Sequence, residues 1–184
     1  MRKLIIYISL VLYGLQGAVI AQDNNGPAEI KIEITQVTDD LYRFQYHMHA
    51  SAFLVTDEGI IITDPVTEEA GLWLKQELKR RFDKPVPYMI YSHHHSDHIG
   101  GAGVFADESV NIVSHELAKE ALVKLYDKAK LPIPDMTFED EMTISLGGKT
   151  VRLIHVKPGT HGNSLIVVFF VGLFPLIEWG NLSP

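Results

Sequence analysis

Cysteine is missing from all 184 positions of this sequence, and its absence narrows the chemistry that the chain can perform. Without thiols there are no disulfides, no cysteine nucleophile and no thiolate ligand for a metal ion. A Gly-x-Ser-x-Gly motif is missing as well, which argues against a serine hydrolase. Any metal that the chain binds must therefore be held by nitrogen and oxygen atoms.

Positive charge is also scarce. The chain has 16 Lys and Arg residues against 23 Asp and Glu residues, a net charge of −7, and no basic stripe. The sequence therefore predicts no positively charged surface to which a nucleic acid or an anionic membrane would bind. Because 46% of the residues are hydrophobic and 21% are charged, we expect one ordinary core and one domain with a small-molecule substrate.

The N-terminus has the three parts of a secretory signal peptide. A short cationic start, Met1-Arg2-Lys3, precedes a nearly continuous apolar run from Leu4 to Ile20. Small or medium residues then fill the cleavage region. We predict a signal peptide over residues 1–21, a polar linker over 22–29, and a periplasmic or secreted protein with no stable membrane span. A membrane anchor is the alternative, although a run of about 17 apolar residues is short for a bilayer span.

Residues 30–184 have the patterns of one domain that mixes strands and helices. Alternating apolar residues predict an opening β-meander, and helical spacing after Asp64 predicts a helix that Asp64 caps and that begins at Pro65. A second helix is expected after Ser114, which is read as its cap. The predicted strands are 30–34, 41–46, 52–56, 59–63, 87–91, 110–113 and 164–171, with a hairpin of 142–146 and 150–156.

Four histidines and a carboxylate lie within six positions, His93-His94-His95-Ser96-Asp97-His98, directly after the strand predicted over 87–91. Neutral imidazole is the commonest protein ligand of metal ions. In an extended loop, residues two apart point the same way, so His93 and His95 can converge on one ion while His94 faces elsewhere. Asp97 and His98 can turn toward a second ion. The alternative is a surface histidine run without an enzymatic role.

The pattern His93-x-His95-x-Asp97-His98 resembles the signature of the metallo-β-lactamase superfamily. Gly100-Gly101 after it and the upstream stretch from Gly59 to Asp64 are similar to that family too. The resemblance covers roughly residues 37–164. It implies an α/β (α+β) fold, the αββα sandwich of metallo-hydrolases, incomplete in this chain, and one or two zinc ions, with iron or manganese in some members.

Residue by residue, the resemblance implies that His93 and His95 bind a first metal ion and that Asp97 and His98 bind a second. Asp64 would support these ligands from behind, beside its role as a helix cap. The remaining histidines receive structural interpretations: His94 as a filler, and His47 and His49 on the surface of an edge strand rather than in a cleft. We expect His115 to be exposed in the first turn of its helix.

The third ligand of the first metal is expected in a loop with the pattern Pro-Gly-His-Thr-x-Gly-Asn. This chain reads Pro158-Gly159-Thr160-His161-Gly162-Asn163, with its histidine one place later. We predict His161 as the third ligand; if one residue has been lost, the true ligand is absent. His155, on the strand before the loop, is the poorer candidate.

The family also carries a bridging aspartate and a final histidine, whereas this sequence has no aspartate after Asp140 and no histidine after His161. The chain therefore resembles the N-terminal half to two-thirds of a metallo-hydrolase. Such a portion would leave apolar faces uncovered, so we expect a homo-oligomer or low solubility.

These features predict a zinc-dependent hydrolase that uses metal-bound hydroxide on a small ester-, lactone- or β-lactam-like substrate. Asp97 is the predicted catalytic residue, because its carboxylate could accept a proton from the attacking water. The alternative is a catalytically weak or inactive metal-binding remnant of a metallo-hydrolase.

Overall fold

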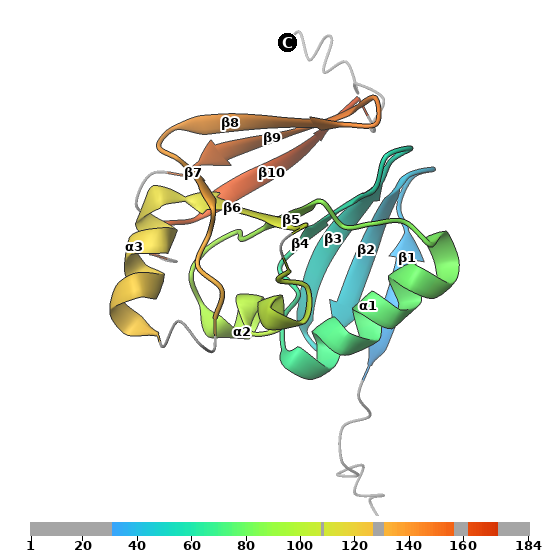
Figure 1. Cartoon of the computed structure of the whole chain (residues 1–184), viewed down its shortest axis with the longest axis horizontal. Helices are drawn as coiled ribbons and strands as arrows, with labels where there is room; N and C mark the ends of the chain where they lie inside the picture. Colours follow the sequence, from blue (N-terminus) through green and yellow to red (C-terminus); the bar gives the residue numbers. More distant parts are fainter. Residues whose placement is uncertain (1–30, 108, 127–130, 157–161, 173–184) are drawn as a thin grey trace, which may run out of the picture.

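The computed structural model describes residues 31–107, 109–126, 131–156 and 162–172. The predicted signal peptide, the linker and His161 lie outside these residues. In the described part, two β-sheets face each other, and the helices cover the other side of the larger sheet (Figure 1). The described residues thus supply three layers of the expected αββα sandwich: helices, a seven-stranded sheet and a three-stranded sheet. None of the described helices is long and apolar enough to cross a membrane.

The first half of the large sheet is the predicted antiparallel meander. Each strand follows its neighbour through a short turn, and the register runs without a break from one pair to the next. The third strand begins three residues earlier than predicted, at His49 instead of Ala52. Its strands are β1 (Ile32–Gln36), β2 (Leu41–Tyr46), β3 (His49–Val55) and β4 (Ile60–Thr63).

The second half of the large sheet is parallel, because helices return the chain to the same end between strands. Strands β4 to β7 lie in chain order, so the carboxyl ends of β4, β5 and β6 meet at one edge of the sheet. β7 was not predicted. The elements are α1 (Glu68–Phe82), β5 (Tyr88–Ile90), α2 (Ser96–Ile99), η1 (Ala102–Val104), β6 (Asn111–His115), α3 (Glu116–Leu125) and β7 (Met136–Phe138).

Alternate residues of the buried strands serve two hydrophobic cores. On β4, Ile60 and Ile62 pack against the helices together with Leu74 and Leu78 of α1, whereas Ile61 faces the small sheet. All five side chains are almost completely buried. The uninterrupted apolar run of this strand follows from its place between two layers.

The small sheet is the predicted hairpin followed by one strand. Its turn has Gly147 and Gly148 at φ values of 50° and 76°, a backbone that favours glycine at both positions. The outer side chains of its last strand, Val167, Phe169 and Val171, are exposed. Self-association through such a face stays a prediction. The strands are β8 (Glu141–Leu146), β9 (Lys149–His155) and β10 (Ile166–Val171).

The predicted cap of the first helix is wrong. The helix begins at Glu68, and the cap is Thr67, whose hydroxyl accepts a hydrogen bond from the amide of Ala70 at 3.2 Å. Residues 64–66 precede the helix in a non-helical conformation, with positive φ at Asp64 (31°) and Val66 (65°), and Val66 forms an isolated β-bridge with Ile99. The carboxylate of Asp64 is engaged elsewhere, as described below.

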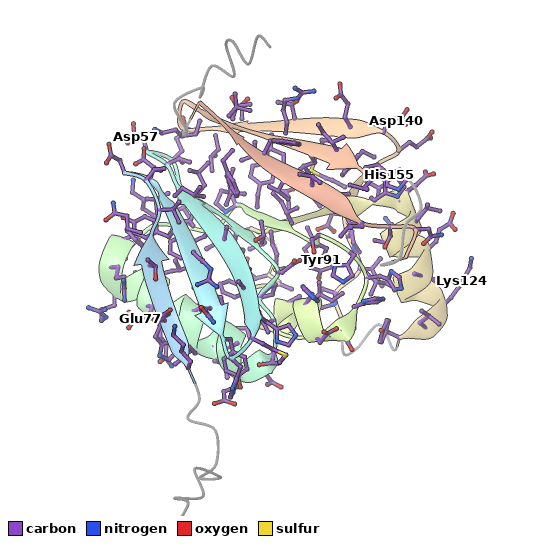
Figure 2. All side chains as sticks on the ribbon, turned by 180° about the vertical axis from the view of Figure 1, so that it is seen from behind. Asp57, Glu77, Tyr91, Lys124, Asp140 and His155 are labelled. Atoms are coloured by element: carbon purple, nitrogen blue, oxygen red, sulfur yellow. The ribbon has the colours of Figure 1, made fainter. Side chains whose placement is uncertain are left out.

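The predictions for the second helix are wrong as well. Ser114 belongs to β6, and His115 is the cap: its Nδ1 accepts a hydrogen bond from the amide of Leu117 at 3.1 Å. The side chain of His115 is buried, because its Nε2 donates to the carbonyl of Glu139 at 2.6 Å and its ring stacks on that of His155 at 3.7 Å. Figure 2 shows His155 on the side of the small sheet that faces α3.

An ion-pair cluster on α1 provides a pH-dependent test of the fold. The carboxylate of Glu77 accepts hydrogen bonds from Arg80 and Arg81, which lower its pKa from 4.5 to about 2. Because the pKa of Glu77 is lower in the folded state, the cluster adds stability above pH 4.5, and this stability is lost as the pH falls toward 2. We expect Glu77→Gln to lower the free energy of unfolding at pH 7 by about 1 kcal/mol or less. In urea titrations the difference from wild type should vanish near pH 2; a difference independent of pH would contradict the ionic origin.

Candidate metal centre

Three segments of the chain converge where the parallel strands end. The histidine loop, residues 91–95, connects the end of β5 to the start of α2. Asp64 comes directly after β4, the strand that pairs with β5. β3 is antiparallel to β4, so its first residue, His49, lies at the same edge. In Figure 1 this edge lies beside α2. Ligand sites are common at the carboxyl ends of parallel strands.

Asp64 supports the histidine loop from behind. Its side chain is buried, and its Oδ1 accepts a hydrogen bond from the amide of Ser92 at 2.8 Å. Its Oδ2 lies 2.5 Å from the Ser92 hydroxyl and 3.5 Å from Nδ1 of His98. The same carboxylate therefore orients both the start of the loop and the histidine at its end.

These contacts define which nitrogen of His93 carries the proton. The hydroxyl of Ser92 has one hydrogen, and the carboxylate of Asp64 can only accept it. Nδ1 of His93, 2.9 Å from the same hydroxyl oxygen, must then be the donor. His93 consequently carries its lone pair on Nε2, the arrangement of a metal-ligating histidine whose other nitrogen is hydrogen-bonded.

The structure brings the predicted ligands of the loop together. The ring centroid of His93 lies 4.6 Å from that of His95 and 4.3 Å from that of His98. The hydrogen bond to Asp64 raises the pKa of His98, although partial burial opposes this shift. Nδ1 of His98 faces Asp64, while its Nε2 lies 4.0 Å from Oδ2 of Asp97.

His49 joins this group, and its predicted place on an edge-strand surface is wrong. Its Nε2 lies 3.2 Å from Oδ2 of Asp97, and its ring meets that of His98 edge-on at 5.5 Å. Burial alone would raise the pKa of Asp97, but the hydrogen bond from His49 helps to hold this pKa below its usual range. Three residues, His49, Asp97 and His98, each offer one possible metal-ligand atom, and these atoms lie within 4.8 Å of one another.

His47 does not share this contact. It occupies the turn between β2 and β3 with a φ of 53°, and its ring lies edge-on against Tyr46. The sequence did contain a signal for His49 at the site, the antiparallel pairing of β3 with β4. A strand that begins at His49 places this residue beside the end of β4, whereas the predicted strand, which begins at Ala52, leaves His49 outside the sheet.

His94 connects the histidine loop to the small sheet. Its Nδ1 lies 2.8 Å from the hydroxyl of Ser164, and burial lowers its pKa. The amide of Ile166 also donates to the carbonyl of Ser92 at 2.9 Å. His94 thus has a definite partner beyond its predicted role as a filler. These bonds hold the segment that follows residues 157–161.

His155 has a structural contact of its own. Its Nε2 donates to the carbonyl of Asn163 at 2.9 Å, just after the loop that contains His161. His161 itself lies outside the described residues, so its predicted role as the third ligand stays a prediction.

One cavity among the described residues lies away from the candidate ligands. It has a volume of about 810 Å³ and is lined by Leu72, Ser96, Tyr126 and Leu131, among others, but by none of the candidate ligands. Because no candidate ligand lines this cavity, the histidine loop remains the candidate site.

Residues 47–173 match the family model described as the metallo-beta-lactamase superfamily. The match spans more than half of the chain and contains every residue of the candidate site. The chain belongs to the metallo-β-lactamase superfamily. Members of this superfamily bind divalent metal ions, and the described residues contain two groups that could hold one: His49, Asp97 and His98, and Asp64, His93 and His98.

The curated relatives of the chain are distant in sequence. A hydroxyacylglutathione hydrolase of Prochlorococcus marinus is 27% identical over 68% of this chain and 46% of its own length. The alpha subunit of a 2,4-dinitroanisole O-demethylase of Nocardioides is 26% identical over 77% of this chain and 41% of its own. A type 2 metallo-beta-lactamase of Bacteroides fragilis is 26% identical over 92% of this chain and 68% of its own. The chain spans about half the length of the first two.

Solved structures in the superfamily share the fold. The metallo-beta-lactamase GOB-18 of Elizabethkingia meningoseptica has a TM-score of 0.66 and 24% identity, over 79% of this chain and 59% of that one. A metallo-beta-lactamase of Pontibacter korlensis has a TM-score of 0.63 and 22% identity, over 76% and 67%. These likenesses support the sandwich architecture, which the sequence predicted.

The donor atoms fit the metal ion that the superfamily implies. The site offers imidazole nitrogens and carboxylate oxygens, which zinc accepts in tetrahedral sites and which iron and manganese accept as well. Both His93 and His98 have their Nδ1 directed at a hydrogen-bond partner behind the site. Such support is usual for histidines that bind a metal through the other nitrogen.

Two substitutions of Asp64 distinguish the effect of its charge from the effect of its hydrogen bonds and its positive φ. We expect Asp64→Ala to lose about 3 kcal/mol of stability, because the amide and hydroxyl of Ser92 lose their acceptor and alanine disfavours a positive φ. Zinc affinity should fall by about 10- to 100-fold. Asp64→Asn tolerates the same φ and keeps one acceptor, so it should recover most of the stability but little of the affinity. Chemical denaturation and zinc titration measure the two effects; equal zinc affinity in Asp64→Asn and wild type would contradict the role of the charge.

Proposed function

We propose that this chain is a zinc-dependent hydrolase of small ester-, lactone- or β-lactam-like substrates. The observation that carries the proposal is the convergence of three imidazoles and one carboxylate, from His93, His95, His98 and Asp97, at the carboxyl end of a parallel strand. The supporting carboxylate of Asp64 fits the same chemistry, because a histidine run without a function needs no buried acceptor behind it.

In this proposal, His93, His95 and His161 hold a first zinc ion, and Asp97 and His98 belong to a second site. A bound zinc ion would supply an activated water at neutral pH and would polarise the carbonyl of the substrate. Asp97 is the group that accepts the proton of that water, since its carboxylate is ionised and remains partly accessible. Asp64, through Ser92, keeps His93 in the tautomer that the first site requires.

The substrate class rests on chemistry and on the relatives. The names of two relatives, a hydroxyacylglutathione hydrolase and a metallo-beta-lactamase, denote hydrolysis of an acyl compound and of a β-lactam. Esters, lactones and lactams share an electrophilic carbonyl, so one activated water serves them all. Specificity among them depends on the loops around the site.

Metal analysis and a substrate panel test the proposal. The purified protein should contain about one to two zinc ions per chain and should hydrolyse at least one of a chromogenic cephalosporin, p-nitrophenyl acetate and an acyl-homoserine lactone. Incubation with EDTA should abolish turnover, and added zinc should restore it. A folded, zinc-loaded protein that is inert to the whole panel would overturn the proposal.

A non-catalytic metal-binding protein is the second candidate. It is favoured by the displacement of His161 from the expected pattern. Zinc binding without turnover on any substrate of the panel would support this candidate.

Export to the periplasm or the medium is part of the proposal, on the strength of the N-terminal pattern of residues 1–21. Expression in a bacterium followed by N-terminal sequencing tests it. The exported protein should begin at Gln22; recovery of the uncleaved chain in the membrane fraction would favour the anchor.

A further inference from the structure

We propose that His49 is itself a ligand of the second metal ion, which makes His49, Asp97 and His98 a three-residue site. This inference rests on the proposed function and deepens it, because it assigns a ligand that the resemblance does not provide. The ligands come from two distant segments of the chain, the start of β3 and the short helix α2.

The distances suit a shared cation. Two ligand atoms at about 2.1 Å from a tetrahedral zinc ion are ~3.4 Å apart. Oδ2 of Asp97 lies 3.2 Å from Nε2 of His49 and 4.0 Å from Nε2 of His98. Each of the three residues offers one ligand atom, and these three atoms lie within 4.8 Å of one another. Small side-chain rotations are therefore enough for the three residues to surround an ion.

The orientation of His98 also suits a ligand. Its Nδ1 faces Asp64, which directs its Nε2 toward Asp97 and His49. Its ring is also close to that of His93, so the second site would lie directly beside the first. A water or a substrate carbonyl between the two sites could then contact both.

The backbone holds His49 in place. The turn before β3 is fixed by a hydrogen bond from the amide of His47 to the carbonyl of Lys31 at 2.7 Å. A second bond joins the side chain of Gln45 to the carbonyl of His47, also at 2.7 Å. The pairing of β3 with β4 then sets where His49 lies relative to Asp64. Sites built on such regular elements are more precise than sites on loops.

A structural role explains the arrangement less well. The side chain of Asp97 is 60% exposed and that of His49 is 28% exposed, and an ion pair in that position contributes little to stability.

The test uses the full chain and three variants: His49→Ala, His49→Gln and His47→Asn. Glutamine keeps a hydrogen-bond donor toward Asp97 but is a poor zinc ligand, and His47→Asn removes the neighbouring imidazole while tolerating its positive φ. The readouts are zinc stoichiometry by elemental analysis and the visible absorption of cobalt(II) added to the metal-free protein. Circular dichroism and thermal unfolding verify that each variant is folded.

We expect wild type and His47→Asn to bind two ions per chain. Both His49 variants should bind one ion tightly, with second-site affinity lowered by at least about 100-fold. Second-site affinity equal to wild type in His49→Ala, or restored in His49→Gln, would overturn the inference. Wild type that binds only one ion would also overturn it, and would leave a single-metal hydrolase intact. Two ions without turnover would leave His49 as a ligand but would count against the proposed function.

Discussion

Replacement of His95 by alanine is expected to lower the proposed hydrolysis by at least about 10³-fold, because the variant would lose one imidazole ligand of a zinc ion that would lower the pKa of water from about 15.7 to about 7. The fold should survive. The backbone of His95 is extended, with φ −73° and ψ 134°, a conformation that alanine adopts without strain. The measurement is kcat/KM on the best substrate of the panel, together with zinc content and the thermal unfolding midpoint.

His47→Asn is the matched control for this experiment, because it removes an imidazole that lies near the site but makes no contact with Asp97 among the described residues. Its kcat/KM should stay within about twofold of wild type. Full activity in His95→Ala with an unchanged zinc content would show that His95 is not a ligand, and the first site would then need another set of residues.

Replacement of Gly101 by alanine should strongly lower the stability of the fold. A Cβ atom at this position would lie 2.3 Å from the carbonyl oxygen of Thr67 and 2.6 Å from that of Pro65. Both contacts are with backbone atoms, which cannot rotate away as a side chain would. We expect a loss of about 3 kcal/mol in the free energy of unfolding, measured by urea denaturation.

The same clash should reach the metal centre. The chain between β4 and α1 is bonded to α2, since the amide of Val66 donates to the carbonyl of His98 at 2.7 Å. A shift of this segment therefore displaces His98, and zinc affinity should fall with stability. Gly103→Ala is the control, because no atom lies within 4 Å of a Cβ atom there. Its stability should change by no more than about 0.5 kcal/mol. An equal loss in the two variants would contradict the steric account.

Local patterns predicted most of the fold. The alternation from residue 41 to 63, the helical spacing up to Arg81 and the glycine turn at 147–148 each correspond to an observed element, because those elements are long or have a characteristic turn. β7 has only three residues, Met136–Phe138, and too short a run shows no period. The family and the layers of the sandwich followed from the histidine motif.

Tertiary contacts explain the predictions that failed. Asp64 resembles a helix cap in sequence, but the amide and hydroxyl of Ser92 bind its carboxylate, and Thr67 caps the helix instead. His115 was expected to be exposed, yet the carbonyl of Glu139 and the ring of His155 enclose it. These partners are distant in sequence, so no local pattern indicates them. His49 differs, because correct strand pairing would have revealed it.

The main-chain bond between the Ile166 amide and the Ser92 carbonyl joins the small sheet to the histidine loop. That amide can exchange its hydrogen for deuterium only when strand and loop separate. The rate at which the Ile166 amide takes up deuterium, followed by mass spectrometry, therefore measures how often this contact between the small sheet and the histidine loop opens. An ion that binds side chains on both sides of this contact would slow the exchange of the Ile166 amide.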